Sequence, residues 1–389
     1  MAVERKQIFR FLRAVILPIF FGGFMALVFE PERYDAERVK GKNRIFFCGR
    51  TLAGADWWRN LYTLLLIISV SVLYAVFGGG WTTGNNPGLG IFLLVVTKVL
   101  VTMTISAWIL AALSDPGIIP RSNTPPEDLP QDLPPGHVAL KEVVINSVTV
   151  GLIYCGTCQI WRPPRSSHCR ICDNCVEVFD HHCTWLGNCI GSRNYGWFYL
   201  FVLYTDLLAA FTLWGSILFL VGFSNETAAE RGVSGVEGLN IILSETPASV
   251  VLVCAIICFI ALLAFVPLLI LHTRLIYANK TTKEHITKKS WENGKPYEEE
   301  EGCKHCGSVL CSERKESMVW KSYNPAAGDP ESGKESDGVS DENGLVNDQA
   351  VVEVVVHGKN IVEEIPELAR LPSNPQTLKV EPVRDQPPG

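Results

Sequence analysis

The chain has 389 residues, 48% of them hydrophobic, and a mean hydropathy of +0.19. That hydropathy is too high for an average soluble protein of this length and predicts membrane spans. The net charge is −6, with the acid concentrated near the C-terminus and basic residues beside the apolar runs, which argues against nucleic acid as a partner.

The first 60 residues are expected to form a cytosolic N-terminal region. Residues 14–29 are apolar, but this run has only 16 residues, contains Pro18 and follows Arg10 and Arg13. A helix needs about 20 apolar residues to cross the hydrocarbon core of a bilayer. We therefore expect an interfacial helix at 14–29, with a fifth membrane span as the alternative.

Four further apolar runs are long enough to cross a membrane as helices. They cover residues 61–77, 89–113, 197–223 and 250–271. Lys98 and Asp206 are the charged residues inside them, and a helix–helix contact or snorkelling explains such charges more simply than a function does. The sequence predicts two helix pairs, at 61–113 and 196–272, separated by a long loop at 114–195.

The charges between the apolar runs predict their orientation. Residues 30–59 carry seven Lys or Arg, and basic residues also flank the 114–195 loop and follow residue 271, whereas the two other loops are poor in them. Loops rich in Lys and Arg face the cytosol. We predict a multi-pass membrane protein with both termini and the 114–195 loop in the cytosol, in an endomembrane (ER or Golgi) in preference to the plasma membrane.

The long loop holds a dense cluster of metal-ligating side chains within residues 153–195. Residues 143–154 alternate β-branched and polar side chains, which predicts a strand leading into the cluster. The ten Cys and His residues of the cluster are Cys155, Cys158, His168, Cys169, Cys172, Cys175, His181, His182, Cys183 and Cys189. Cys-x2-Cys pairs in a loop that faces the reducing cytosol indicate zinc in preference to disulfides.

Two tetrahedral zinc sites need eight ligands, so two filled sites leave one His and one Cys without a metal. The densest part of the cluster is the tetrapeptide Asp180-His181-His182-Cys183. A spare thiol beside a spare imidazole and a carboxylate is typical of a nucleophile for acyl transfer. The alternative is a ligand-binding zinc module in which Cys183 is one more thiol.

Two short motifs outside the cluster complete a family pattern. Asp115-Pro116-Gly117 follows the second apolar run, and Thr281-Thr282-Lys283-Glu284 follows the fourth. Together with the Cys/His cluster and Asn194 behind it, they resemble the DHHC family of protein S-acyltransferases. The resemblance covers roughly residues 30–312 and implies an α-helical polytopic membrane protein, with four transmembrane helices and a small zinc-bound cysteine-rich domain between spans 2 and 3.

The resemblance implies a role for each residue of the cluster. Cys155, Cys158, His168 and Cys175 would hold one structural zinc, and Cys169, Cys172, His182 and Cys189 would hold a second. Cys183 would be the nucleophile that carries the acyl group, His181 the general base and Asp180 the residue that orients it. The motif residues Asp115, Pro116, Gly117, Asn194, Thr281, Thr282 and Glu284 would be structural. The implied reaction moves a palmitoyl group from palmitoyl-CoA to cysteines of membrane-associated proteins by a ping-pong mechanism.

Basic residues near the membrane ends of the loops could contact the acyl-CoA. Five basic residues near the cytosolic face are candidates for contacts to the CoA phosphates: Arg162, Arg165, Arg193, Lys280 and Lys283. Snorkelling at the bilayer surface is the simpler explanation for any one of them. Because a single acyl chain anchors a protein weakly, we expect substrates that already carry a prenyl group or a polybasic segment, such as Ras-like proteins.

The region 273–321 contains a second cysteine cluster, formed by Cys303, Cys306 and Cys311. It resembles the tail of the Ras-acylating branch of the family, which implies a small accessory subunit, and a palmitoylated or metal-bound tail is the alternative. Residues 322–389 are rich in Gly, Ser, Pro and acidic residues, so we expect disorder, with a β-prone island at 351–356.

Two other functions remain to be weighed. A membrane-anchored zinc adaptor would bind partners without turnover, and acylation of Cys183 would distinguish the enzyme from it. A transporter is disfavoured because the spans carry two charges and no broken-helix pattern.

Overall fold

The computed structural model describes residues 33–130, 138–145, 148–232, 240, 244–287, 307, 309, 316–320 and 354–357. The helix expected at 14–29 lies outside the described residues, as do Cys303, Cys306, Cys311 and most of the expected tail.

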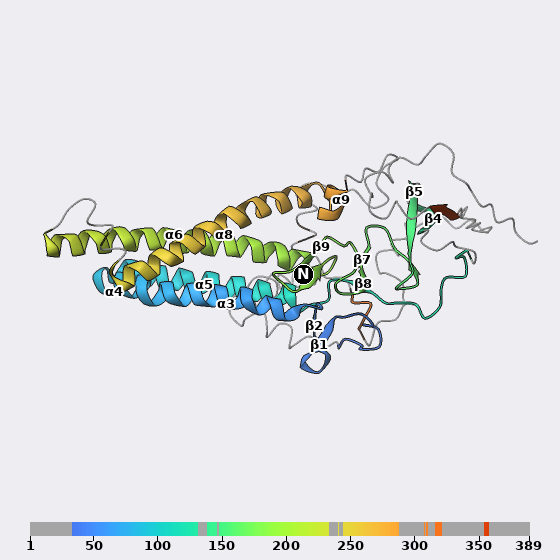
Figure 1. The fold of residues 1–389 in the computed structure, drawn as a ribbon, viewed down its shortest axis with the longest axis horizontal. Coiled ribbons are helices and arrows are strands. Elements are labelled where there is room, and N and C mark those ends of the chain that lie inside the picture. The colour runs from blue at the N-terminus through green and yellow to red at the C-terminus, as the bar shows by residue number, and fades with distance from the viewer. Residues whose placement is uncertain are drawn as a thin grey trace, which may run out of the picture.

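Four long apolar helices form the larger part of the structure, which confirms the predicted four-span architecture. They cover Trp57–Asn85, Pro87–Ala112, Tyr195–Arg231 and Thr246–Tyr277. The first consists of η3 (Trp57–Arg59), α3 (Asn60–Leu73), the π-helical η4 (Tyr74–Gly79) and α4 (Gly80–Asn85), and the others are α5, α6 and α8. They lie side by side along the long axis of the molecule (Figure 1), and α6 packs against both α5 and α8.

Local sequence signals place the helix ends. The side chain of Asn86 accepts a hydrogen bond from the backbone N–H of Leu89 (3.2 Å), and Pro87 occupies the first turn of α5. At its C-terminal end, α6 continues past the predicted residue 223 to Arg231 and stops at Gly232, whose φ of 66° is left-handed. The prediction ended α6 too early because it followed apolar residues, and the last two turns are polar but still helix-forming.

Apolar side chains cover the outside of the bundle as well as its interior. Leu65, Val95 and Leu263 are 60%, 55% and 63% exposed, with comparable side chains along all four helices. Such a surface is unstable in water and suits a hydrocarbon solvent. The exposed faces therefore agree with a lipid-embedded bundle.

The cysteine-rich region lies at one end of the bundle and is built from short strands (Figure 1). Three of them, β3 (Ile118–Ile119), β8 (Asn174–Val176) and β7 (Ser167–Cys169), form an antiparallel sheet in that order. A separate hairpin pairs β9 (His181–Cys183) with β10 (Asn188–Ile190). A second two-stranded hairpin, β1 (Arg44–Phe46) with β2 (Thr51–Ala53), precedes the first membrane helix.

The strand predicted at 143–154 is wrong in its extent. The structure has an antiparallel hairpin instead, in which β4 (Val138–Ile145) pairs with β5 (Val148–Cys155), and β5 also pairs with β6 (Ile160–Trp161). Alternation of β-branched side chains continues through both strands and hides the reversal between them. The pair Asn146-Ser147 between the strands is a turn signal that the prediction did not use.

Two C-terminal segments join this region. Residues 354–357 form β11 (Val354–His357), which pairs with β4, so the expectation of disorder is wrong for these four residues, three of which belong to the β-prone island at 351–356. Residues 316–320 pack against the segment that begins at residue 33, and Trp320 forms an isolated β-bridge with Tyr34. The carbonyl oxygen of fully buried Val319 accepts a hydrogen bond from the N–H of Asp35 (2.8 Å). The short helix α9 (Thr282–Ile286) follows the last membrane helix.

Candidate active site and metal centres

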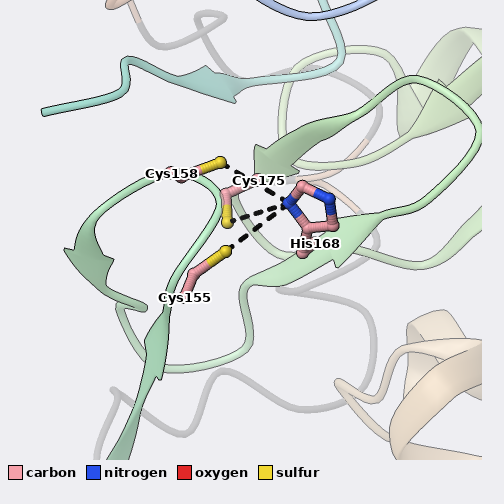
Figure 2. A group of neighbouring side chains, drawn as sticks. All are labelled: Cys155, Cys158, His168 and Cys175. Atoms are coloured by element: carbon pink, nitrogen blue, oxygen red, sulfur yellow. Dashed lines mark hydrogen bonds between the residues drawn. The ribbon is translucent and has the colours of Figure 1, made fainter. Parts of the chain in front are cut away.

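The first metal centre gathers four residues from β5, β7, β8 and the turn after β5. The sulfurs of Cys155, Cys158 and Cys175 lie 3.6, 3.5 and 3.8 Å from Nδ1 of His168. Figure 2 shows the three thiols converging on one ring nitrogen. These are the four residues that the sequence predicted for one zinc site.

The second centre has the same composition and the second predicted set of residues. The sulfurs of Cys169, Cys172 and Cys189 lie 3.7, 3.5 and 3.5 Å from Nδ1 of His182. All three thiols are buried. The two sets interleave because His168 and Cys169 are neighbours on β7, and neighbouring residues of a strand face opposite sides.

Both centres fit a tetrahedral zinc ion. With Zn–S near about 2.3 Å and Zn–N near about 2.0 Å, a sulfur and a nitrogen ligand are separated by roughly 3.5 Å. The observed sulfur–nitrogen distances of 3.5–3.8 Å match this spacing. Three thiols and one imidazole are the ligand chemistry of closed structural zinc sites, so each set can hold one zinc.

The strand β9 separates a metal ligand from the residues beside it. His182 is in the middle of β9 and faces the second metal centre, so His181 and Cys183 share the opposite face. That arrangement leaves one imidazole and one thiol outside both metal centres. They are the surplus pair that the ligand arithmetic predicted.

Asp180 holds His181 in one orientation. The Asp180 carboxylate, 2% exposed, lies 2.7 Å from Nδ1 of His181 through Oδ2 and accepts the backbone N–H of Thr282 through Oδ1 (2.6 Å). Burial raises the pKa of Asp180, but the contacts with His181 and Thr282 outweigh it and leave that pKa below its ordinary value. Burial lowers the pKa of His181, but hydrogen bonds to Asp180 and Cys183 outweigh it and raise that pKa to about 9.

The thiol of Cys183 lies where the cysteine-rich region meets the bundle. It is 7% exposed and belongs to an apolar cluster with Trp108 of α5, Leu186 of the β9–β10 turn and Phe201 of α6. Partly buried side chains of α3 and α8 pack against the same cluster, among them Leu64 and Phe265. A thiol in this position can react with a group whose tail lies among the membrane helices.

Sequence reasoning missed the aromatic surroundings of His181. Its ring meets the ring of Phe198 edge-on at 5.2 Å and lies 6.1 Å from the ring of His272. His272 is 1% exposed, and its Nδ1 lies 2.9 Å from the hydroxyl of Tyr195. His272 belongs to α8 and directly follows the apolar run 250–271, so a sequence signal for it was present but was not used.

The Asp-Pro-Gly motif closes the junction between α5 and the cysteine-rich region. Fully buried Asp115 accepts the backbone N–H groups of Gly117 (2.9 Å) and Ile118 (2.8 Å), and its other oxygen accepts from Arg193 (2.8 Å) and Ser317 (2.6 Å). Gly117 has a φ of 105°, and a Cβ there would approach Ser192 Oγ to 2.5 Å. The motif thus joins α5 to the cysteine-rich region through hydrogen bonds, and Pro116 contributes a backbone acceptor for the N–H of Arg193 (3.4 Å).

The side chain of Asn194, one residue before α6, also joins α5 to the cysteine-rich region through hydrogen bonds. Its side-chain N–H groups donate to the carbonyl oxygens of Ala111 (3.0 Å) and Cys189 (2.9 Å). Its oxygen accepts the backbone N–H of Gly191 (3.0 Å). One amide therefore connects the end of α5 to a ligand of the second metal centre.

The Thr-Thr-Lys-Glu motif forms a capping box at the start of α9. The Thr281 hydroxyl accepts the N–H of Glu284 (3.1 Å), while the Glu284 carboxylate accepts the N–H of Thr281 (2.8 Å). Glu284 also receives two hydrogen bonds of 2.9 Å from the guanidinium of Arg165. This arrangement presents the N–H of Thr282 to Asp180.

The five basic candidates lie in different surroundings. Arg165 donates to Glu284 and Asn279, and Arg193 is buried between Asp115 and the ring of Trp320. Arg162 donates weakly to the carbonyl of Ile153 (3.4 Å), and Lys283 donates to Ser167. Lys280 is exposed. The structure thus brings Arg165 and Lys283 close to the Asp180 region and places Arg193 in the core of the junction.

Comparisons with known proteins agree with this geometry. The DHHC palmitoyltransferase domain profile matches residues 149–289. Palmitoyltransferase ZDHHC18-B of Danio rerio is 37% identical over 307 residues, covering 73% of this chain and 74% of its own. Human palmitoyltransferase ZDHHC14 is 36% identical over 304 residues, covering 73% of this chain and 58% of its own, and Danio rerio palmitoyltransferase ZDHHC9 is 36% identical over 296 residues, covering 71% of each. With this domain match and identities of 36–37% over more than two thirds of its length, the chain belongs to the DHHC palmitoyltransferase family.

Proposed function

We propose that the protein transfers a palmitoyl group from palmitoyl-CoA to cysteine thiols of membrane-associated proteins through an acyl intermediate on Cys183. The observation that carries this proposal is the geometry of β9. His181 and Cys183 share the face opposite the metal ligand His182, and Asp180 fixes the His181 ring through a 2.7 Å contact.

The first half-reaction follows from the chemistry of a thiolate. The Cys183 sulfur, with its proton on His181, attacks the carbonyl carbon of the acyl-CoA thioester, and a new carbon–sulfur bond forms. The bond to the CoA sulfur then breaks, and CoA leaves with the proton returned from His181. Asp180 stabilises the imidazolium that exists between the two events, as the orienting carboxylate does in other nucleophile–base pairs.

The second half-reaction repeats these steps with the partners exchanged. A substrate thiol gives its proton to His181 and attacks the acyl-Cys183 thioester, and Cys183 leaves as the thiolate. One thioester is exchanged for another in each half-reaction, so no ATP is needed. Bound zinc would keep β9 and β10 in place, because closed sites of three cysteines and a histidine leave no position open for substrate.

The surroundings of Cys183 suit a long acyl chain. Its thiol is in an apolar cluster that includes residues of α3, α5, α6 and α8. Burial of an acyl chain stabilises its binding by ~0.8 kcal/mol per CH2. The chain would therefore lie among the helices, with the thioester at the membrane surface beside the cysteine-rich region.

The remaining assignments concern partners and location. We propose that the protein is in an endomembrane, with both termini and the cysteine-rich region on the cytosolic side, because the loops rich in Lys and Arg face the cytosol. Exposed Lys280 and partly exposed Arg162 are the basic residues best placed for CoA phosphates. Ras-like proteins with a prenyl group or polybasic segment are the proposed substrates, and Cys303, Cys306 and Cys311 the proposed contact to a small accessory subunit.

The test is labelling of the purified protein with an alkyne-tagged palmitoyl-CoA, for the wild type, Cys183→Ser and Cys183→Ala. We expect a hydroxylamine-sensitive label on the wild type and none on either variant, with about two zinc ions per chain in all three. Label that persists in both variants would place acylation on another cysteine. Loss of zinc from the variants would make Cys183 a metal ligand and would favour the adaptor without turnover.

A further inference from the structure

The second metal centre is in contact with a carboxylate from a distant part of the chain. Nε2 of His182 lies 3.0 Å from Oδ1 of Asp56, which is 126 residues earlier in the chain. The other ring nitrogen, Nδ1, faces the three thiols of the centre. A histidine that binds zinc through Nδ1 carries its hydrogen on Nε2, so this contact is a hydrogen bond donated to the Asp56 carboxylate.

Asp56 is largely buried where it makes this contact. It is 9% exposed and lies immediately before η3, the first turn of the first membrane helix. Its Oδ1 contacts His182, and its Oδ2 lies 3.6 Å from the guanidinium of Arg59. The carboxylate is thus nearly removed from solvent, which strengthens its interaction with the imidazole.

The segment before Asp56 also lies against the second centre. The N–H of Lys42 donates to the carbonyl of Cys172 (2.8 Å), and the Asn174 side chain donates to Asn43 (2.9 Å). A Cβ on Gly54 would come within 2.1 Å of the carbonyl oxygen of Gly187, in the turn between β9 and β10. Backbone therefore meets backbone here without room for a side chain.

The first turns of α3 continue the same contact surface. Thr63 donates to the carbonyl of Trp185 (2.9 Å), and Asn60 donates to the carbonyl of Leu186 (3.4 Å). Both carbonyls belong to the β9–β10 turn that follows Cys183. The start of the first membrane helix is thus fastened to the hairpin that carries the nucleophile and two ligands of the second centre.

The first centre provides the internal comparison. Nε2 of His168 lies 3.4 Å from Oδ1 of Asp173, which comes from the same cysteine-rich loop and is also paired with Arg121 (3.0 Å). The Asp173 side chain is 32% exposed, whereas that of Asp56 is 12% exposed. The first centre therefore has a longer, more hydrated and local contact, and the second has a shorter one that reaches the membrane domain.

We propose that Asp56 is a positioning residue of the second metal centre. Its hydrogen bond to His182 fixes the orientation of this ligand and couples zinc binding to the packing of the cysteine-rich region against the first membrane helix. Carboxylates in this position orient the imidazole and increase its basicity as a ligand. The proposal rests on zinc in the second centre and is independent of the acyl transfer proposed above.

The test measures zinc, so it does not depend on enzyme activity. Full-length wild type, Asp56→Ala, Asp56→Asn and the control Asp128→Asn are purified in detergent, and zinc release to a chromogenic chelator is followed over time. Asp128 pairs with Lys141 (2.6 Å) and accepts the ring N–H of Trp161 (2.8 Å), and neither partner is a metal ligand. We expect Asp56→Ala to weaken the binding of one of the two zinc ions by about 10–100-fold and to leave the other as in the wild type.

The variant Asp56→Asn distinguishes loss of the hydrogen bond to His182 from a general loss of protein stability. Its amide oxygen can still accept the His182 N–H, so it should retain most of the zinc affinity that Asp56→Ala loses. Cobalt substitution adds a spectroscopic readout, since the d–d bands of one cobalt should shift in Asp56→Ala and return in Asp56→Asn. Unchanged release from Asp56→Ala, or equal acceleration of both ions in either variant, would overturn the proposal.

Discussion

The two metal centres have the same ligands but different neighbours. In the first centre, the thiols pack against Ile119 and Met318, and the ligating histidine has a carboxylate from its own loop. In the second, the ligating histidine lies between His181 and Cys183 on β9 and reaches a carboxylate at the start of the membrane domain. The two centres therefore have equal ligand chemistry and different surroundings, and we expect the second to align β9 and the first to support the region around it.

Loss of a ligand should give the largest difference between the centres. Cys189→Ala removes a ligand from β10 and should lower acyl labelling of Cys183 more than about tenfold, because β9 and β10 lose the ion that holds them. Cys158→Ala in the first centre should retain a measurable label. Both variants should fall from about two zinc ions per chain to about one, by metal analysis. Equal labelling in the two variants would contradict the assigned division of roles.

The ion pair of Arg165 and Glu284 connects the segment before His168 to the proposed catalytic residues. Arg165 precedes the ligand His168, while Glu284 caps the helix whose first N–H holds Asp180. Their side chains are 12% and 7% exposed, so Arg165→Ala leaves the buried Glu284 carboxylate without its cationic partner. The expected loss is about 3 kcal/mol of stability, with weaker Cys183 labelling.

Thermal unfolding in detergent measures this loss, with Arg162→Ala as the matched control. Arg162 belongs to the same loop but donates to a carbonyl at 3.4 Å, so its removal should cost much less. An Arg165→Ala protein as stable as this control would show that the pair does not support the site.

Chelation should resolve the two centres in the wild-type protein. The His168 side chain is 16% exposed and that of His182 is 7% exposed. Zinc should therefore leave in two phases, the first centre releasing its ion several-fold faster than the second. Stopped-flow absorbance with a chromogenic chelator measures both rates, and acyl labelling should follow the slow phase. Labelling lost with the fast phase would reverse the assignment.

The smallest effect is expected on the hairpin beyond the first centre. Lys141 pairs with Asp128, and their side chains are 22% and 35% exposed. An exposed pair of this kind contributes about 0.2–1 kcal/mol. Lys141→Ala should therefore leave zinc content and acyl labelling unchanged. A clear loss of label would show that the hairpin takes part in catalysis.

Much of the site could be predicted because its signals are local in the chain. The dense Cys/His cluster indicates zinc, and counting its ligands leaves one His and one Cys beyond two tetrahedral sites. The family resemblance then implies which residues form each set and that His181 and Cys183 are the surplus pair. The four spans followed from apolar runs of sufficient length. Each of these signals comes from residues that lie within a few tens of positions of one another in the chain, and the structure contains each of the features that they indicate.

The missed features depend on contacts between distant segments. Asp56 and His182, or Ser317 and Asp115, are far apart in sequence, and a lone Asp or Ser has no pattern that announces its partner. The 143–154 error has another cause, because alternation in two consecutive strands reads as one long strand. The arginines at 165 and 193 appear from sequence as free cations, whereas folding pairs them with buried carboxylates.

The sequence by itself determined the membrane spans, the Cys/His cluster and a surplus of one His and one Cys over two zinc sites, because hydropathy and ligand number are properties of short segments. The family resemblance implied the two ligand sets and the surplus Asp180, His181 and Cys183. Tertiary structure alone decided where that surplus lies: beside α6 and α8, fastened to the start of α3, and held through Thr282 from beyond the last membrane helix. The physical reason is that strand alternation fixes which side chains share a face. Only the packing of distant elements decides what that face meets.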